Sequence, residues 1–401
     1  MTLHAQDLIN IPEETVRVAQ AAFPKGNVYM TMRDQLNLWY KDSDYAYLFV
    51  SVEGRPAESP GRLNLIMVMQ YAEGLTDEQT AEAVRSRIDW KYAWGLPLSD
   101  PGFDKSVLSK HRGRLLQGGT ETQLLDDMLR QMQSAKLLEG RGQQRTDSTH
   151  VLAKVRALNR LELIGETLRQ ALNELARQHP TWLLEQISPD WFELYGPRFE
   201  QYRLPKEKQE QQALAEQIGS DGYHLLEVID GPHAPKGLVE LPPLQTLRQV
   251  WIQQFMWVEG QVQLRNQDNR PRPQQAIETP YDLEARYSKK RETRWTGYKV
   301  HLTETCHDNQ PRLITNVETT PAPIPDIQLT QTIHAHLAQK DLLPKEHLLD
   351  TAYVDAHGLV ASQTDYQVEL VGPVPPTAVG KLKHNLALRQ PALALIGLPN
   401  K

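Results

Sequence analysis

The sequence predicts an α plus α/β protein: a helical N-terminal domain, then a mixed sheet that a helical insertion interrupts. Three observations lead to this fold class. Apolar residues recur at helical spacing over residues 61–139, and the Thr- and Val-rich stretch 144–152 is typical of a strand. From Gly297 to Thr303 the apolar period then changes to two. Strands that alternate with helical stretches favour a sheet assembled from distant segments.

The composition is that of an ordinary globular protein. The chain has 401 residues, of which 40% are hydrophobic and 23% charged, so we expect two or three domains. The longest apolar run, Leu63–Met69, is too short to span a bilayer, and the N-terminus has no basic region followed by an apolar one. Cys306 is the single cysteine, which excludes an internal disulfide and a thiolate-rich zinc site. We therefore expect a cytoplasmic protein with no membrane partner.

The charge is distributed unevenly. A net charge of −6 argues weakly against nucleic-acid binding. However, residues 141–160 hold five basic residues and one acid, residues 286–299 hold six and one, and residues 81–114 hold seven and four. Local basic stretches decide phosphate binding, because the field of a charge decays within about 8 Å at physiological salt. These stretches indicate either phosphate contacts or solvated faces.

The N-terminal part divides into a lead segment, residues 1–60, and a helical domain, residues 61–139. Thr76 and Gln79 have the spacing of a capping box that begins a helix. Residues 90–97 interrupt the helical pattern, and Asp100-Pro-Gly predicts a turn. Further helices follow, and Gly140-Arg-Gly142 marks the end of the domain.

The second part begins with residues 140–160, which contain the strand 144–152. Residues 161–280 are predicted to be a helical insertion that ends in a polar, proline-bearing linker from about residue 266. One face of its first helix carries an apolar stripe: Leu161, Ile164, Leu168, Leu172 and Leu175. The insertion therefore should have a hydrophobic core of its own.

Residues 281–375 are predicted to complete the sheet. Residues 297–303 and 312–319 should form a hairpin, a helix should cover residues 329–337, and a strand should run from His347 to Asp350. A helix at 355–364 and a strand at 367–371 follow. Residues 376–401 fit none of these patterns, and we interpret them as an aberrant tail.

Two aspartates on predicted strands suggest a metal site. In-line cleavage of a phosphodiester can use two metal ions about 3.5–4 Å apart, and Mg²⁺ prefers carboxylate oxygens. Asp147 lies in the strand 144–152, and Asp350 ends the strand at 347–350. On adjacent strands the two carboxylates would converge. The alternative is that Asp147 is a turn residue and Asp350 caps the following helix.

Several long motifs resemble one family of proteins. The segment from Thr76-Asp-Glu-Gln to Asp100-Pro-Gly-Phe-Asp-Lys-Ser resembles the N-terminal domain, of the InsH type, of insertion-sequence transposases. Arg145-Thr-Asp-Ser-Thr, Leu158-Asn-Arg-Leu-Glu-Leu-Ile-Gly-Glu, Ala285-Arg-Tyr-Ser-Lys-Lys-Arg and Gly297-Tyr-Lys-Val-His-Leu-Thr resemble the DDE catalytic domain of the same group. The resemblance runs in order from about residue 20 to about residue 375.

The resemblance implies a ribonuclease-H-like core that uses two aspartates and a glutamate to hold two Mg²⁺ (or Mn²⁺) ions. By position Asp147 matches the first aspartate and Asp350 the second. Relatives read Asp-x-Gly-Tyr after the second aspartate, whereas this chain reads Asp350-Thr-Ala-Tyr353. The implied activity is metal-dependent cleavage and strand transfer at the ends of a bacterial insertion sequence. The implied partners are double-stranded DNA, both terminal inverted repeats and target DNA, and further copies of the chain, at the bacterial nucleoid.

Basic residues in two of the charged stretches are the candidate DNA contacts. In the helical domain they are Arg85, Arg87, Lys91, Lys105, Lys110, Arg112 and Arg114. Around the hairpin they are Lys289, Lys290, Arg291, Arg294 and Lys299. Solvated faces explain these residues nearly as well.

The chain departs from the family at its third acid. The only acids after Asp350 are Asp355, Asp365 and Glu369, and none lies where the glutamate is expected. We infer a C-terminally truncated transposase. Two hypotheses follow: an enzyme for metal-dependent DNA nucleotidyl transfer, or a catalytically inactive relic that binds DNA.

Overall fold

The computed structural model describes residues 2–5, 10–36, 40–49, 54, 56–153, 158–272, 274–290, 292–307 and 311–373. Within them the chain divides into two compact units. The first contains the described residues up to 144 together with 304–315 and 336–346, and the second contains 145–303, 316–335 and the described residues from 347 on. Arg291 and the predicted tail, 376–401, lie outside the described residues.

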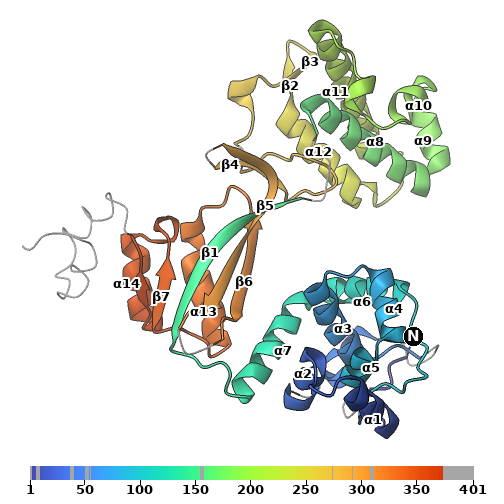
Figure 1. Ribbon diagram of the computed structural model, residues 1–401. Coiled ribbons are helices and arrows are strands. Elements are labelled where there is room, and N and C mark those ends of the chain that lie inside the picture. The colour runs from blue at the N-terminus through green and yellow to red at the C-terminus, as the bar shows by residue number, and fades with distance from the viewer. Residues whose placement is uncertain are drawn as a thin grey trace, which may run out of the picture. The chain divides into compact units, whose positions relative to one another are not determined.

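Helices make up the N-terminal part of the first unit (Figure 1). They are α1 (Glu13–Ala22), α2 (Val28–Leu36), a 3-10 helix (Asp42–Leu48), α3 (Pro60–Glu73), α4 (Asp77–Ser86), α5 (Ile88–Trp94), α6 (Ser106–Gln117) and α7 (Glu121–Ser134). Trp90, Trp94 and Ile66 lie in their shared hydrophobic core. The capping box at Thr76 is present, with Gln79 as its second member.

The helical pattern was expected to break at residues 90–97, and the start of this break is wrong. Helix α5 continues to Trp94, and Gly95 ends it in the left-handed conformation. Six consecutive residues of α5, from Asp89 to Trp94, are buried. A helix that is buried on all sides shows no polar face, so its period of 3.6 cannot be seen in the sequence.

The lead segment packs onto the helical domain. Tyr45 and Tyr40 belong to the same hydrophobic core as α3 and α5. The Tyr45 hydroxyl donates to Asp127 Oδ2 of α7 at 2.6 Å, and the Thr15 hydroxyl donates to the carbonyl oxygen of Leu96 at 2.8 Å. The two stretches separated at residue 60 therefore share one core.

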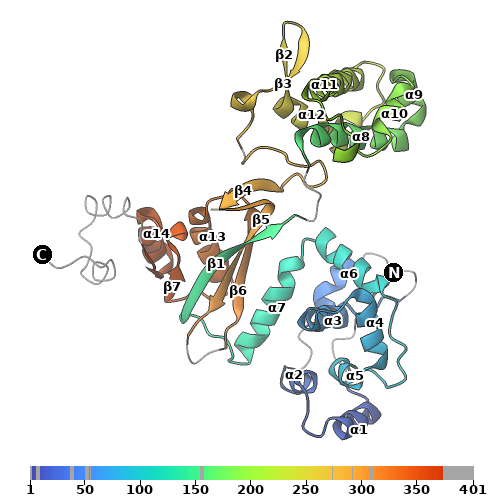
Figure 2. The same ribbon diagram turned by 45° about the horizontal axis from the view of Figure 1, so that its top comes forward.

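The sheet contains β1 (Gln143–Leu152), β4 (Arg286–Lys290), β5 (Thr293–Thr305), β6 (Ile314–Pro321), β7 (Glu346–Leu349) and β8 (Glu369–Val371). The order is β4-β5-β1-β7-β8, and β6 also pairs with β5. Helices α13 (Thr330–Gln339) and α14 (Ala356–Tyr366) connect β6 to β7 and β7 to β8. The expected mixture of helices and a sheet is confirmed, and β1, β5 and β6 lie side by side in both views (Figures 1 and 2).

Strand β1 lies between an antiparallel neighbour, β5, and a parallel neighbour, β7. Backbone bonds from Cys306 N–H to Gln143 and from Ala153 N–H to Thr296 fix β1 antiparallel to β5. On its other side, the Gln143 side chain bonds Glu346 and the Thr146 hydroxyl bonds His347, so β1 and β7 run in the same direction. Strands distant in sequence thus bring residues 147 and 350 to neighbouring positions in the strand order.

Gly297 sits where several strands meet. It pairs with Arg286 of β4, and its carbonyl oxygen accepts from Ala322 N–H just after β6. Its φ is 150°, and a Cβ there would lie 2.3 Å from the Val151 carbonyl oxygen. Only glycine allows β1 to approach β5 this closely.

The helical insertion contains α8 (Arg160–Gln178), α9 (Pro180–Gln186), α10 (Asp190–Tyr195), α11 (Lys208–Asp230), α12 (Pro242–Gln254) and a hairpin of β2 (Phe255–Val258) and β3 (Gln261–Leu264). The predicted stripe on α8 is buried, with Ile164, Leu168 and Leu175 fully inaccessible. The predicted linker contains a 3-10 turn, Gln267–Asn269.

Two adjacent glutamines hold the entry and the exit of the insertion. At the entry, Arg160 donates to the side-chain oxygen of Gln254 at 2.7 Å and to its carbonyl oxygen at 2.9 Å. At the exit, Ile277 N–H donates to Gln253 Oε1 at 2.9 Å, and Gln253 donates to the carbonyl oxygen of Gln275 at 2.9 Å. We call these contacts the glutamine clasp. They fasten both ends of the insertion to the last turn of α12.

We predict that Gly297→Ala lowers the free energy of unfolding by roughly 2–4 kcal/mol, because the new Cβ meets β1 backbone at an unfavourable φ. Gly113→Ala is the control: no atom lies within 4 Å of a Cβ there, and the helix should gain up to about 1 kcal/mol. Urea unfolding followed by tryptophan fluorescence measures both. Equal stability of Gly297→Ala and the native chain would contradict the assigned strand contact.

Candidate active site and nucleic-acid interface

Asp147 lies in β1, and Asp350 lies directly after the neighbouring strand β7. Asp147 is exposed within β1, and its Oδ1 accepts from Ser148 N–H at 2.7 Å. Asp350 is exposed directly after β7, and its Oδ1 accepts from Ala352 N–H at 2.9 Å. Asp350 is thereby the cap of a 3-10 turn, Thr351–Tyr353. The strand context predicted for Asp147 is confirmed, whereas Asp350 lies one residue beyond β7 and caps the following turn, as the alternative expected. Their sharing of a metal ion stays a prediction.

Both carboxylates act on one buried hydroxyl, that of Tyr353. Burial raises the pKa of this phenol well above its usual range, and a hydrogen bond with Ser148 opposes the rise. The negative charges of Asp326, Asp350 and Asp147 raise the pKa further. Tyr353 is also 2.5 Å from His301 Nδ1.

Asp326 is balanced by Lys299. The Lys299 ammonium forms an ion pair with Asp326 Oδ1 and also donates to the Ile324 carbonyl oxygen. The side chains are 14% and 8% exposed. Ser148 Oγ lies 3.3 Å from Asp326 Oδ2. The structure thus corrects the assignment of Lys299 to DNA contact, because breaking this pair would leave a buried carboxylate uncompensated.

The described carboxylates do not complete a three-acid site. Within the described parts of the chain, no three His, Cys, Asp or Glu side chains are grouped so that they could hold a metal ion. Of the acids after Asp350, Asp355 caps α14 by accepting from Gly358 N–H at 2.6 Å, and Asp365 and Glu369 are exposed. No third acid among the described residues is therefore grouped with Asp147 and Asp350.

A chain of buried polar groups lies on the other face of β1. Side chains alternate along a strand, so buried Thr146 points away from the face that exposes Asp147. Thr146 Oγ1 is 2.7 Å from Thr303 Oγ1 and 2.7 Å from His347 Nε2. His347 Nδ1 is in turn 2.9 Å from His334 Nε2. Burial lowers the pKa of His334 to about 4, and burial together with His334 lowers that of His347 to about 3.

The hairpin of β4 and β5 carries the second basic stretch. Lys289 is directly opposite Arg294, and Lys290 is opposite Thr293; all four side chains are exposed. Like charges directly opposite each other destabilise a strand pair. A phosphate beside Lys289 and Arg294 would relieve this repulsion, so the hairpin is the better placed of the two candidate DNA contacts.

Lys91 cannot serve as a DNA contact in this structure. Its side chain is buried, and Nζ donates to the carbonyl oxygen of Asp100 at 2.7 Å. Burial lowers its pKa. An ammonium held inside the helical domain satisfies the turn at residues 97–100, and the basic pattern of the sequence gave no indication of this burial.

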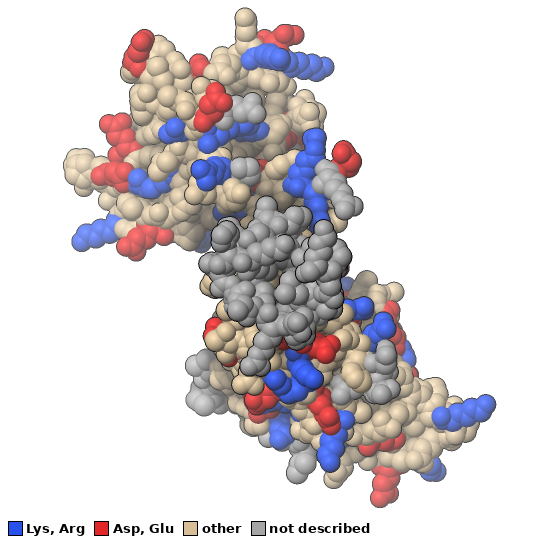
Figure 3. Space-filling model, turned by 90° about the vertical axis from the view of Figure 1, so that its left-hand side faces the viewer, with Lys and Arg blue, Asp and Glu red and all other residues tan. Residues whose placement is uncertain are grey.

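The other basic residues of the helical domain fall into two groups. Arg87 bonds Glu73 and Asp89, and Arg112 bonds Asp77, so these guanidiniums stabilise the domain. Arg114 lies 4.9 Å from the ring centroid of Phe49. Arg85, Lys105 and Lys110 are more exposed. Of these, Arg85 pairs with Glu82 and Lys105 pairs with Glu78. On the face shown in Figure 3, basic and acidic side chains are interspersed.

Sequence reasoning missed Asp326, His301 and Tyr353 as neighbours of the aspartates. Tyr353 had one indication, its place three residues after Asp350. The other two had none, because their proximity comes from the pairing of β5 with β1 and from the turn before α13.

Comparison with known proteins identifies the N-terminal part. The model of a transposase domain (DUF772) matches residues 17–114. This match supports a transposase family for the chain. It begins within α1 and ends within α6, and so includes the lead segment from residue 17 on. Neither the curated proteins nor the solved structures gave a match. Among the helices that the structure describes, none is long and apolar enough to cross a membrane.

We predict that acid destabilises the second unit through its histidine pair. His334 and His347 have folded-state pKa values of about 4 and about 3, below the unfolded value of about 6.5. The unfolded chain therefore binds protons first as the pH falls below 6.5, and stability that is complete above this pH is lost toward pH 4. Each histidine should contribute about 1.4 kcal/mol per pH unit.

The free energy of unfolding in urea, measured from about pH 7.5 down to about pH 4.5, tests this prediction. This range begins above the unfolded pKa and approaches the folded pKa values. A variant with both His334→Gln and His347→Gln should show a flatter pH dependence, whereas His357→Gln, at an exposed position, should not. The same pH dependence in the double variant and the native chain would refute the assignment.

Proposed function

We propose that this chain is a DNA transposase of a bacterial insertion sequence, which binds the ends of its element. The observation that carries the proposal is the match of residues 17–114 to a transposase domain. The strand order supports a ribonuclease-H-like catalytic core, since β1, which contains Asp147, is next to β7, which Asp350 directly follows. The partners we propose are double-stranded DNA, as terminal inverted repeats and target, and other copies of the chain at the bacterial nucleoid.

In this proposal Asp147 and Asp350 hold Mg²⁺ or Mn²⁺, which supplies charge stabilisation for phosphodiester cleavage and strand transfer. Such ions contribute several kcal/mol to transition-state stabilisation, and carboxylates on rigid strands suit them. Asp326, paired with Lys299, also contacts Ser148, and this contact would help to hold the part of β1 that carries Asp147.

A second candidate is a DNA-binding protein that does not cut. The observation that favours it is the incomplete carboxylate set among the described residues. Two Mg²⁺ ions bring four positive charges, of which two aspartates offset only part. A protein of this second kind would bind element ends without turnover.

We predict that the chain binds Mn²⁺ weakly and leaves element-end DNA uncut. Asp147→Asn and Asp350→Asn should each weaken Mn²⁺ binding, measured by electron paramagnetic resonance, by about tenfold or more, because each removes one of few anionic ligands. Asp365→Asn is the matched control, an exposed aspartate on α14.

The cleavage assay uses the same proteins with DNA that carries element ends, in Mg²⁺ or Mn²⁺. Cutting by the native chain that disappears in both Asp147→Asn and Asp350→Asn would establish the enzyme and remove the second candidate. Mn²⁺ binding that neither substitution changes would remove both aspartates from the proposed site.

We predict that DNA binding falls steeply with salt and depends on the basic hairpin. The slope of log K against log salt should be about −0.9 per phosphate contact. Replacing Lys289 and Arg294 together by Gln should therefore reduce its magnitude by about 2, and Lys110→Gln by about 1. Fluorescence anisotropy of duplex DNA with the full chain measures these slopes.

Arg177→Gln is the control for this experiment, because Arg177 is exposed and already paired with Glu174. If the hairpin substitutions left both affinity and slope unchanged, the hairpin would have no role in phosphate binding. A chain that bound no duplex DNA at low salt would contradict the proposed function itself.

A further inference from the structure

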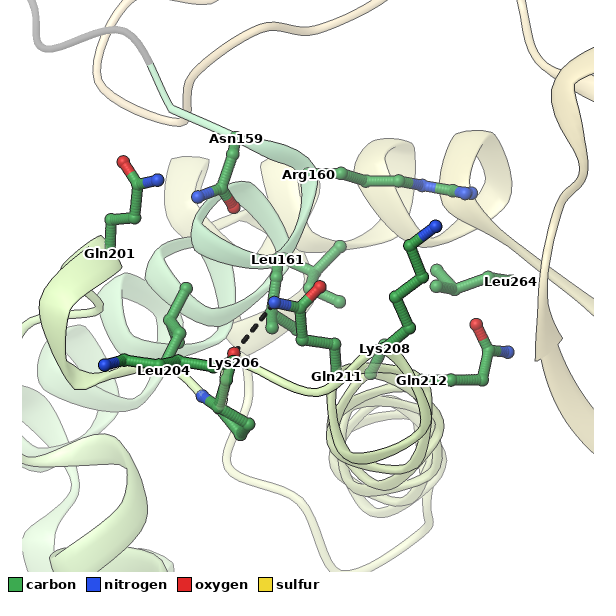
Figure 4. A pocket seen from close by; sticks show the side chains of 13 residues that line it. Asn159, Arg160, Leu161, Gln201, Leu204, Lys206, Lys208, Gln211, Gln212 and Leu264 are labelled. Carbon is green, nitrogen blue, oxygen red and sulfur yellow. Dashed lines mark hydrogen bonds between the residues drawn. The ribbon is translucent and has the colours of Figure 1, made fainter.

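The helical insertion contains a pocket of about 820 Å³ that the proposed reaction does not use. The start of α8, the loop at 204–206, the start of α11 and the end of β3 surround it (Figure 4). Its volume lies within the range of small-molecule sites and is far larger than one inorganic anion requires. The pocket therefore has room for a ligand with both a charged group and an uncharged body.

The charged side chains that line this pocket are all basic: Arg160, Lys206 and Lys208. Two carboxylates outside the lining bond residues that belong to it, Asn159 and Gln212. Glu162 accepts from the backbone N–H of Asn159 at 2.9 Å, and Glu216 accepts from the Gln212 side chain at 2.5 Å. The lining is thus suited to an anion.

Two hydrogen bonds hold the Arg160 guanidinium in place, and both acceptors are neutral, so they do not compensate its charge. It is half-buried and donates to two neutral oxygens of Gln254 within the glutamine clasp. Burial, and then the positive charge of Arg270, lower its pKa to about 10. A cation with neutral partners and a basic neighbour is stabilised when an anion binds beside it. In Figure 4 the Lys208 side chain extends from α11 toward the Arg160 side of the pocket.

The remaining walls suit a flat, partly apolar body with polar edges. Leu161, Leu204 and Leu264 give an apolar wall. Gln211 is held by a bond from its Nε2 to the Pro205 carbonyl oxygen at 2.8 Å, which leaves its oxygen free to accept (Figure 4). Side-chain amides pair with the edges of nucleobases, and apolar walls cover their faces.

We propose that this pocket binds a nucleoside phosphate, with the phosphate against Arg160 and Lys208 and the base against the leucine wall. The ligand has two possible sources of the same chemistry: a free nucleotide, or an unpaired nucleotide at the end of a DNA strand. None of these residues belongs to the carboxylate site or the basic hairpin, so the pocket is tested independently of DNA cleavage.

Isothermal titration calorimetry of the full chain tests the proposal. The ligands are deoxyadenosine monophosphate, deoxyadenosine, inorganic phosphate and a single strand of five deoxyadenosines. We expect the monophosphate to bind at least about tenfold more tightly than deoxyadenosine or phosphate alone, since each part contributes. A single strand that binds more tightly still assigns the site to DNA ends, and equal affinity assigns it to free nucleotides; both support the pocket.

Lys208→Gln should weaken monophosphate binding about tenfold without changing thermal stability, because this side chain is exposed and stands at the first position of its helix. Lys236→Gln, an exposed lysine elsewhere on the insertion, is the matched control and should bind normally. Arg160→Gln serves as a second variant if its melting temperature is native. The proposal is overturned if phosphate or deoxyadenosine binds as tightly as the monophosphate, if none of the ligands binds, or if Lys208→Gln binds like the native chain.

Discussion

The pairing of β1 with β5 is the constraint on which the second unit depends. Ala153 bonds Thr296 although the whole helical insertion separates them. Closing a flexible loop of roughly 140 residues costs about 4 kcal/mol beyond a constant. The insertion reduces this cost because it has its own hydrophobic core and because the glutamine clasp holds Arg160 and Ile277 to neighbouring residues of α12. The sheet thus closes around a folded module.

Much of the sheet could be predicted because its signals are local. Alternating residues gave the β5–β6 hairpin, and Thr- and Val-rich stretches gave β1. The helix α5 was missed because every side is buried, which removes the amphipathic period. The packing of the lead segment on α7, through Tyr45 and Asp127, was also missed, since contacts between distant segments leave no periodic pattern.

The strand that contains Asp147 and the strand that Asp350 follows could be predicted, because both have local sequence signals. What surrounds the two aspartates could not be predicted. Lys299 looked like one more cation of a basic stretch, yet it neutralises Asp326 beside Ser148. Lys91 looked the same and is bonded inside the helical domain. Whether a lysine can bind a phosphate or instead bonds groups of the protein depends on the burial of its side chain, which composition does not reveal.

The opposed Lys289 and Arg294 place like charges directly across the β4–β5 hairpin. Repulsion across the strands weakens their pairing until some anion stands between them. The stability of this hairpin therefore depends on the anions in solution as well as on the sequence. The β4–β5 pairing should therefore be weaker in chloride than in sulfate, because a divalent anion between Lys289 and Arg294 offsets their repulsion more fully.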